Sequence, residues 1–137
     1  MIRIGQYIGG FYAHPDLTRT VEHNAIDLLE AVNKLMARAE EDQVTFPINP
    51  ATRSQVSGHS YGGFRPQACP IGAPNSKHKR GQAVDIYDPG NLIDAWCLAH
   101  QDVLEECGIW IEHPDKTPHW VHMQNIAPRS GSRVFYP

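Results

Sequence analysis

Apolar residues recur at helical spacing in the first third of the chain. Between residues 17 and 42 they return every three or four positions, while charged side chains fill the positions between them. A period near 3.6 residues places the apolar side chains on one face of an α-helix. We therefore expect an amphipathic helix over about residues 17–42, which packs on a core through Val21, Ala25, Leu28, Leu29, Val32, Leu35, Met36 and Ala39.

Short alternating or β-branched runs mark strands in the second half of the chain. Residues 83–87 and 120–124 alternate between two faces, and residues 109–112 form a third such run. This pattern is typical of strands that are buried on one side. If the first two strands are neighbours in one sheet, Asp85 and His122 can lie on the same face.

A second helical stripe follows the first of these strands. Apolar residues recur from Leu92 to Cys107, Asn91 stands at the N-cap position, and Gly108 follows as a helix-ending residue. We expect an irregular or short extended start before residue 17, and loops with short strands over residues 46–66, which are rich in Pro and Gly. Helices and strands that share one core indicate an α+β fold.

Length and composition fit one folded domain. The chain has 137 residues, 41% of them hydrophobic and 20% charged, which excludes a disordered polar chain. No apolar run approaches the ~18 residues that span a membrane, and we recognise no signal peptide at the start. The net charge of −3 provides no basic field for a phosphate backbone, so we expect no nucleic-acid partner.

Histidine is abundant, and most of the eight histidines follow residue 58. His78 lies in a polar loop that leads into the strand of Asp85, and His122 lies on another strand. Zinc accepts imidazole and carboxylate ligands, and a catalytic site with three protein ligands keeps a position open for water. His78, Asp85 and His122 are therefore candidate ligands, although Asp85 as a strand-end cap and His122 as a core or rim residue are the alternatives. His59, His100 and His113 are interpreted as ordinary surface or hydrogen-bonded histidines.

The cysteines offer no competing metal site. Cys69, Cys97 and Cys107 lack Cys-x-x-Cys spacing. The last two lie on one predicted helix with an axial separation of roughly 15 Å, which is too far for a disulfide. We expect three free thiols in the core.

The segment SKHKRGQAVD at residues 76–85 resembles the S-x-H-x-x-G-x-A-x-D signature of the VanY-like zinc peptidases. These are D-alanyl-D-alanine carboxypeptidases and L-alanyl-D-glutamate endopeptidases that share a fold with hedgehog signalling domains. GGFRP at 62–66, WVH at 120–122 and SGSRVF at 130–135 follow in the family's order, and the last is similar to the SGNRVF ending of phage-encoded members. The resemblance covers residues 55–137. It implies a small antiparallel sheet that carries a zinc site and packs against helices.

By this resemblance, His78, Asp85 and His122 bind one zinc ion per chain, and a water completes the tetrahedron. Arg65 has the place of the family's arginine behind the metal. There it could bind a substrate carboxylate or stabilise the carbonyl oxygen, and the alternative is a surface arginine in a glycine loop. Ser76 and Gly81 are expected to be structural.

The general base has three candidates. Glu112 lies in IEHP, which resembles the L-E-x-P of phage-type members, and it is the first choice. His119 lies three residues before His122, where the dipeptidase branch has a glutamate, and it is the second. Asp115, on the turn between them, is expected to be solvated.

The resemblance implies a zinc metallopeptidase that hydrolyses an amide bond in the peptidoglycan stem peptide through a zinc-activated water. A D-Ala-D-Ala carboxypeptidase and an L-Ala-D-Glu endopeptidase both fit. The alternative from another class is a non-catalytic, zinc-stabilised cell-wall-binding or structural module. We expect a monomer. The phage-type ending favours an endolysin made in the cytoplasm and released through a holin, or a component of a phage particle, over a bacterial remodelling enzyme.

Overall fold

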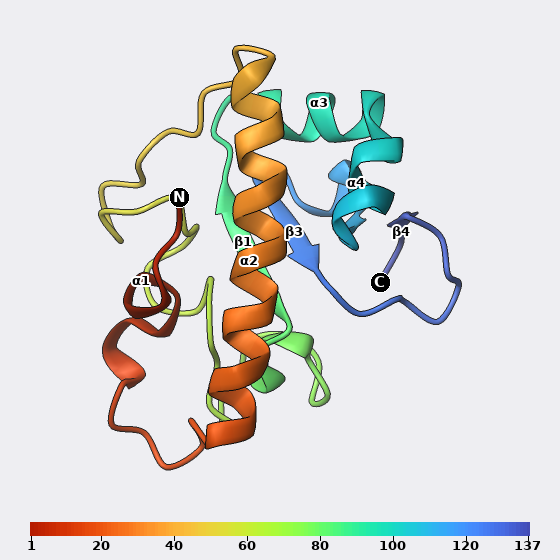
Figure 1. The fold of residues 1–137 in the computed structure, drawn as a ribbon. Coiled ribbons are helices and arrows are strands. Elements are labelled where there is room, and N and C mark those ends of the chain that lie inside the picture. The colour runs from red at the N-terminus through yellow and green to blue at the C-terminus, as the bar shows by residue number, and fades with distance from the viewer.

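Four short strands form one mixed sheet in the computed structural model, which describes residues 1–137 (Figure 1). In sheet order they are β1 (Ala83–Tyr87), β3 (Trp120–Gln124), β2 (Trp110–Glu112) and β4 (Val134–Phe135). β1 and β2 are antiparallel to β3, but β4 is parallel to β2. The expectation of a purely antiparallel sheet is therefore wrong at this edge. After β3 the chain crosses to the far side of β2 and turns back once. β4 therefore runs opposite to β3 and in the same direction as β2.

The longest helix, α2 (Arg19–Glu41), confirms the expected amphipathic helix. It begins at Thr18, whose side-chain oxygen accepts the backbone N–H of Val21 at 3.2 Å. In Figure 1 it runs along the molecule in front of β1 and β3. Of the eight predicted core positions, only Val21 is partly exposed, and the buried ones are Ala25, Leu28, Leu29, Val32, Leu35, Met36 and Ala39.

The second predicted helix is divided in two. α3 (Leu92–Ala99) and α4 (Gln101–Cys107) meet at His100, whose φ of −130° interrupts the helix. Asn91 adopts a left-handed conformation and makes no side-chain cap. The Asp88 carboxylate caps α3 instead, because it accepts two backbone N–H groups of the first turn at 3.1 and 2.9 Å. Gly108 ends α4 as predicted, with a φ of +68°.

The N-terminal segment is more regular than expected. It forms α1 (Ile4–Ile8) and a 3-10 turn, η1 (Gly9–Phe11). Tyr7 of α1 is buried, and its hydroxyl donates to the backbone oxygen of Ala83 at the start of β1. Residues 46–66 form no strand, only two isolated bridges, one of which lies beside β1.

The sheet has one apolar and one polar face because side chains alternate along each strand. The apolar face belongs to the same hydrophobic cluster as the buried face of α2. Its members are all fully buried: Val84, Ile86, Ile111, Val121 and Met123. The opposite face carries Asp85, Glu112, His122 and Gln124 and is available for chemistry.

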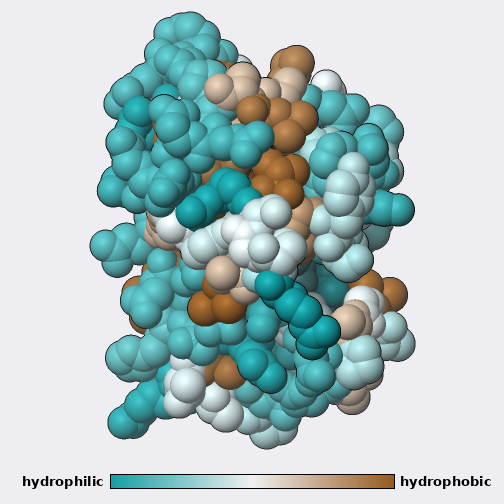
Figure 2. Space-filling model, turned by 90° about the vertical axis from the view of Figure 1, so that its right-hand side faces the viewer, coloured by the Kyte–Doolittle hydropathy of each residue, from teal (hydrophilic) through white to brown (hydrophobic).

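The surface on the side of α3, α4 and the C-terminal segment is mainly hydrophilic, and hydrophobic side chains gather in its upper part (Figure 2). Leu92 and Leu98 of α3 are among the exposed large hydrophobic residues. None of the helices combines the length and apolar composition that crossing a membrane requires. All three cysteines are free thiols.

Candidate metal centre

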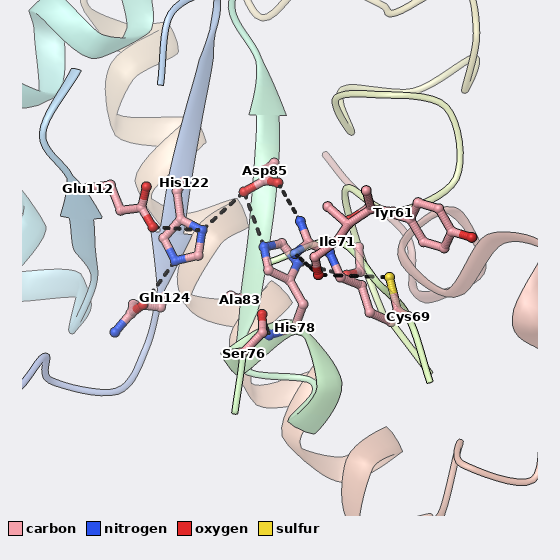
Figure 3. Close-up of polar contacts among 12 residues, drawn as sticks. Tyr61, Cys69, Ile71, Ser76, His78, Ala83, Asp85, Glu112, His122 and Gln124 are labelled. Atoms are coloured by element: carbon pink, nitrogen blue, oxygen red, sulfur yellow. Dashed lines mark hydrogen bonds and ion pairs between the residues drawn. The ribbon is translucent and has the colours of Figure 1, made fainter. Parts of the chain in front are cut away.

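Three side chains from separate segments converge on the polar face of the sheet (Figure 3). His78 Nε2 lies 3.2 Å from Asp85 Oδ1, and His122 Nδ1 lies 3.1 Å from the same oxygen. Each residue offers one ligand atom, and these atoms all lie within 4.8 Å of one another. The three expected ligands thus form a group that could hold a metal ion.

Asp85 and His122 meet through the pairing of β1 with β3. Asp85 is the direct antiparallel partner of His122 in the register of these strands. Directly opposed residues project from the same face with their Cβ atoms roughly 5 Å apart. From the sequence, the two side chains could share a face only if their strands were neighbours. The structure confirms that the strands are neighbours.

His78 reaches the site from a 3-10 turn, η2 (Lys77–Arg80), which precedes β1. Ser76 begins the turn by accepting the backbone N–H of His78 at 3.3 Å, and Gly81 ends it with a φ of +73°. The His78 ring is buried, and its Nδ1 lies 2.8 Å from the backbone oxygen of Gly63. A carbonyl only accepts, so His78 Nδ1 carries a proton that is directed away from Asp85, and Nε2 is the ring nitrogen that faces the carboxylate.

The carbonyl that orients His78 is itself positioned by α1. Phe64 donates its backbone N–H to Tyr7 O at 3.1 Å, which brings Gly63 directly against α1. A Cβ atom at Gly63 would lie 2.0 Å from Tyr7 O, so only glycine fits this approach. The sequence analysis missed Tyr7 and Gly63, although the glycine pair in GGFRP was a signal of close backbone contact.

Arg65 lies behind Asp85 and is buried. Its guanidinium donates to Asp85 Oδ2 at 3.2 Å, to Tyr61 O at 2.7 Å and to Ile71 O at 3.3 Å. The alternative of a surface arginine is therefore excluded. Because Arg65 holds one carboxylate oxygen, the other is left free to face the two imidazoles.

Opposing effects act on the pKa values at this site. Burial raises the pKa of Asp85, but the charge of His78 and hydrogen bonds from His122 and His78 outweigh burial and bring the pKa below its ordinary range. Burial lowers the pKa of His122, but the hydrogen bond and charge of Asp85, together with the charge of Glu112, outweigh burial, so the pKa lies above its ordinary value. The carboxylate is thus ionised at neutral pH, as a metal ligand must be.

Glu112 is the base candidate that the structure brings to the site. Its Oε1 lies 4.0 Å from His122 Nδ1 at the end of β2. His119 is exposed outside the cleft that holds the ligands, and its ring donates to Pro89 O at 3.1 Å. Asp115 is exposed on another 3-10 turn, η3 (Pro114–Lys116).

A cleft of about 840 Å³ opens over the three ligands. The turn that carries His78 forms part of its wall, and the C-terminal segment around β4 contributes other lining residues. Its volume falls within the roughly 300–1,000 Å³ that is typical of sites for small ligands. Arg65, Glu112 and Gln124 line it together with the ligands. A short peptide could therefore reach both Glu112 and the metal group.

Comparisons with protein-family models, curated proteins and solved structures found no match to this chain. The function is therefore inferred from the geometry of this site together with the sequence motifs. The sequence analysis assigned no role to Gln124, whose side chain contacts His122 in the structure.

Proposed function

We propose that this protein is a zinc-dependent peptidase that hydrolyses an amide bond in the stem peptide of bacterial peptidoglycan. The convergence of His78, Asp85 and His122 on one point, with Glu112 beside them in an open cleft, carries the proposal. Catalytic zinc sites use three protein ligands of these types and keep one position open. The resemblance of SKHKRGQAVD, GGFRP and WVH to the VanY-like peptidases supports the peptide substrate.

The donor set fits a zinc ion in charge and orientation. Asp85 is ionised, and the proton on His78 Nδ1 is directed away from the ligand group toward Gly63 O. Zinc bound by these residues supplies Lewis-acid polarisation of the scissile carbonyl and activation of water. Arg65 keeps Asp85 in place through its contact with Oδ2.

Glu112 is the proposed general base and general acid. As the water oxygen bonds to the carbonyl carbon, the Glu112 carboxylate takes a proton from that water. It then passes a proton to the amide nitrogen while the C–N bond breaks, which yields a carboxylic acid and an amine and regenerates the carboxylate. The position of Glu112 in the cleft, 4.0 Å from His122, supports this role over His119 and Asp115.

Lys77 and Arg129 favour an anionic peptide as the substrate. Both line the cleft, and neither takes part in an ion pair with a carboxylate of the protein. A D-alanine terminus and a glutamate residue both present a carboxylate next to a scissile amide. Carboxypeptidase and endopeptidase activities therefore both remain within the proposal, and the SGSRVF ending supports an endolysin or phage-particle protein.

The decisive experiment measures metal content and muropeptide cleavage on one purified sample, with a chelated aliquot beside it. We expect one zinc ion per chain and cleavage that the chelator abolishes. Mass spectrometry of the products names the bond, because loss of one alanine and release of a longer peptide give different masses. Bound zinc without cleavage would favour a non-catalytic module, and a protein that binds no metal would contradict the proposal.

A further inference from the structure

We infer that Lys79 is a positioning residue that holds the 67–75 segment in place as one wall of the cleft over the metal group. This segment leads into the turn that carries His78, and its residues 71–73 and 75 line the cleft. The role of this wall in binding substrate rests on the proposed function. The order of the segment is independent of any activity.

The backbone of the 67–75 segment pairs with no other part of the fold. The segment belongs to no helix or strand, and Pro70 and Pro74 have no N–H to donate. Both of its backbone–backbone hydrogen bonds close local turns, at 3.0 Å each. At the entry, the N–H of Gln67 donates to the Asp16 carboxylate at 2.8 Å. Segments with so few backbone contacts open easily, so side chains from elsewhere must hold this one.

Lys79 supplies two of the side-chain contacts that hold the segment. Its ammonium donates to Gln67 O at 2.8 Å and to Pro74 O at 3.4 Å, one near each end of the segment. Lys79 is only 5% exposed, and it belongs to no ion pair of the protein. Burial of an ammonium costs free energy unless hydrogen bonds compensate it. The two carbonyl oxygens provide that compensation, so the ammonium and both ends of the segment hold one another in place.

Arg65 joins the middle of the segment to the metal group. Its guanidinium donates to Ile71 O at 3.3 Å and to Asp85 Oδ2 at 3.2 Å. Lys79 follows His78 directly on the same turn. The segment is therefore connected to the strand of one ligand and to the turn of another, which fixes the position of the wall relative to the metal group.

The segment presents an apolar side chain to the cleft. Ile71 is 50% exposed and lines the cleft, and it lies beside Asp85 and His78 in Figure 3. A peptide bound at the metal group would cover this side chain, and burial of apolar surface favours binding. The wall therefore suits a peptide with an aliphatic side chain next to the scissile amide, which the alanine residues of the proposed substrate provide.

Substitution of Lys79 separates its hydrogen bonds from its volume. Lys79→Met keeps an unbranched side chain of similar length but cannot donate to Gln67 O or Pro74 O. Lys79→Arg keeps a charged donor at this position and should restore part of the wild-type behaviour. Lys34→Met makes the same chemical change on the exposed surface of α2 and is the matched control.

The direct test is the backbone order of residues 71–73 and 75, measured by ¹⁵N relaxation NMR on the zinc-supplemented protein. We expect order parameters near the rigid value of about 0.85 in the wild type and in Lys34→Met, and below about 0.6 in Lys79→Met. A wall that is in place for about a tenth of the time raises the KM for a muropeptide roughly tenfold, and kcat should stay nearly unchanged. Zinc affinity in a chelator competition should stay within a few-fold of wild type, because all three ligands remain.

Three results would overturn the inference. The first is a mobile segment in the wild type, with order parameters below about 0.6, which requires no variant to fold. The second is a folded Lys79→Met protein, verified by circular dichroism, whose segment is as ordered as in the wild type. The third is an unchanged KM in a variant whose segment is disordered. Absence of peptide cleavage alters no order parameter, so failure of the peptidase proposal is distinguishable from failure of this one.

Discussion

Asp85 and His122 are directly opposed on neighbouring antiparallel strands, with Asp85 Oδ1 3.1 Å from His122 Nδ1. A slip of one residue between β1 and β3 would move one of these side chains to the apolar face of the sheet. The metal group therefore depends on the register of this pair. The apolar residues that alternate with the ligands, such as Ile86 and Val121, maintain that register because they must remain buried.

Removal of the His78 ring should abolish metal binding. His78→Ala leaves only two protein ligands, and we expect its zinc content to fall from about one ion per chain to near zero. Peptide hydrolysis should be lost with the metal. Elemental analysis after dialysis measures the first effect, and circular dichroism verifies that the variant folds. His119→Ala is the matched control, because that ring lies outside the cleft and should leave both properties unchanged. Full zinc content in His78→Ala would contradict the ligand assignment.

Glu112→Gln should separate metal binding from turnover. The amide has nearly the size of the carboxylate but cannot take up a proton, so we expect normal zinc content and a kcat reduced by about 10²–10⁴-fold. Steady-state hydrolysis of a purified muropeptide is the measurement. Asp115→Asn makes the same chemical change on the exposed turn and should be neutral. An unchanged kcat in Glu112→Gln would contradict the assignment of Glu112 as the base.

Asp94 should make the protein less stable as the pH rises from about 4 to about 7. Asp94 of α3 is buried, and neither of its carboxylate oxygens has a hydrogen-bond partner. Burial, and then the charge of Asp88, raise its pKa to about 7. The unfolded chain releases this proton near its ordinary pKa of about 3.9, whereas the folded protein keeps it. The folded state therefore binds more protons in this window, and the free energy of unfolding falls until the pH passes about 7.

Asp94→Asn should remove this contribution. Urea unfolding at pH 5 and pH 8 measures it, and we expect a smaller loss of stability between the two pH values in the variant than in the wild type. Asp102→Asn on the exposed surface of α4 should retain the wild-type difference. If the free energy of unfolding changes equally between pH 5 and pH 8 in Asp94→Asn and in the wild type, the pKa of Asp94 is not raised by folding.

Gly81 and Gly108 allow a matched test of close packing beside the site. Their φ angles are +73° and +68°, so alanine is strained at both positions by about 1–2 kcal/mol. At Gly81 a Cβ atom would also lie 2.5 Å from Val21 O of α2, whereas at Gly108 nothing lies within 4 Å. We expect Gly81→Ala to lose about 1–3 kcal/mol more than Gly108→Ala in denaturant unfolding, because helix backbone cannot move aside easily. Gly81→Ala should also weaken zinc binding, since Gly81 ends the turn that carries His78. Equal losses of stability in the two variants would show that the backbone of α2 moves to make room for the added methyl group.

Local sequence patterns were sufficient to predict α2, three of the four strands and the candidate ligands. The period of apolar residues predicted α2 because helix amphipathicity is a property of contiguous residues. The alternation around Asp85 and His122 predicted two strands, and these side chains could share a face only if the strands were neighbours, as they are. The motif made His78 a further candidate ligand. Each of these inferences depends on residues within one segment or one motif.

Contacts between distant segments were decided only by tertiary packing. The sequence left the general base open among three residues, and the end of β2 brings Glu112 alone to the site, because β2 pairs with β3. The direction of β4 depends on the path of the chain after β3. The acceptor that orients His78, Gly63 O, has no signature of its own, since almost any carbonyl oxygen could serve. The sequence by itself determined which groups can bind a metal, and packing determined which of their atoms face one another.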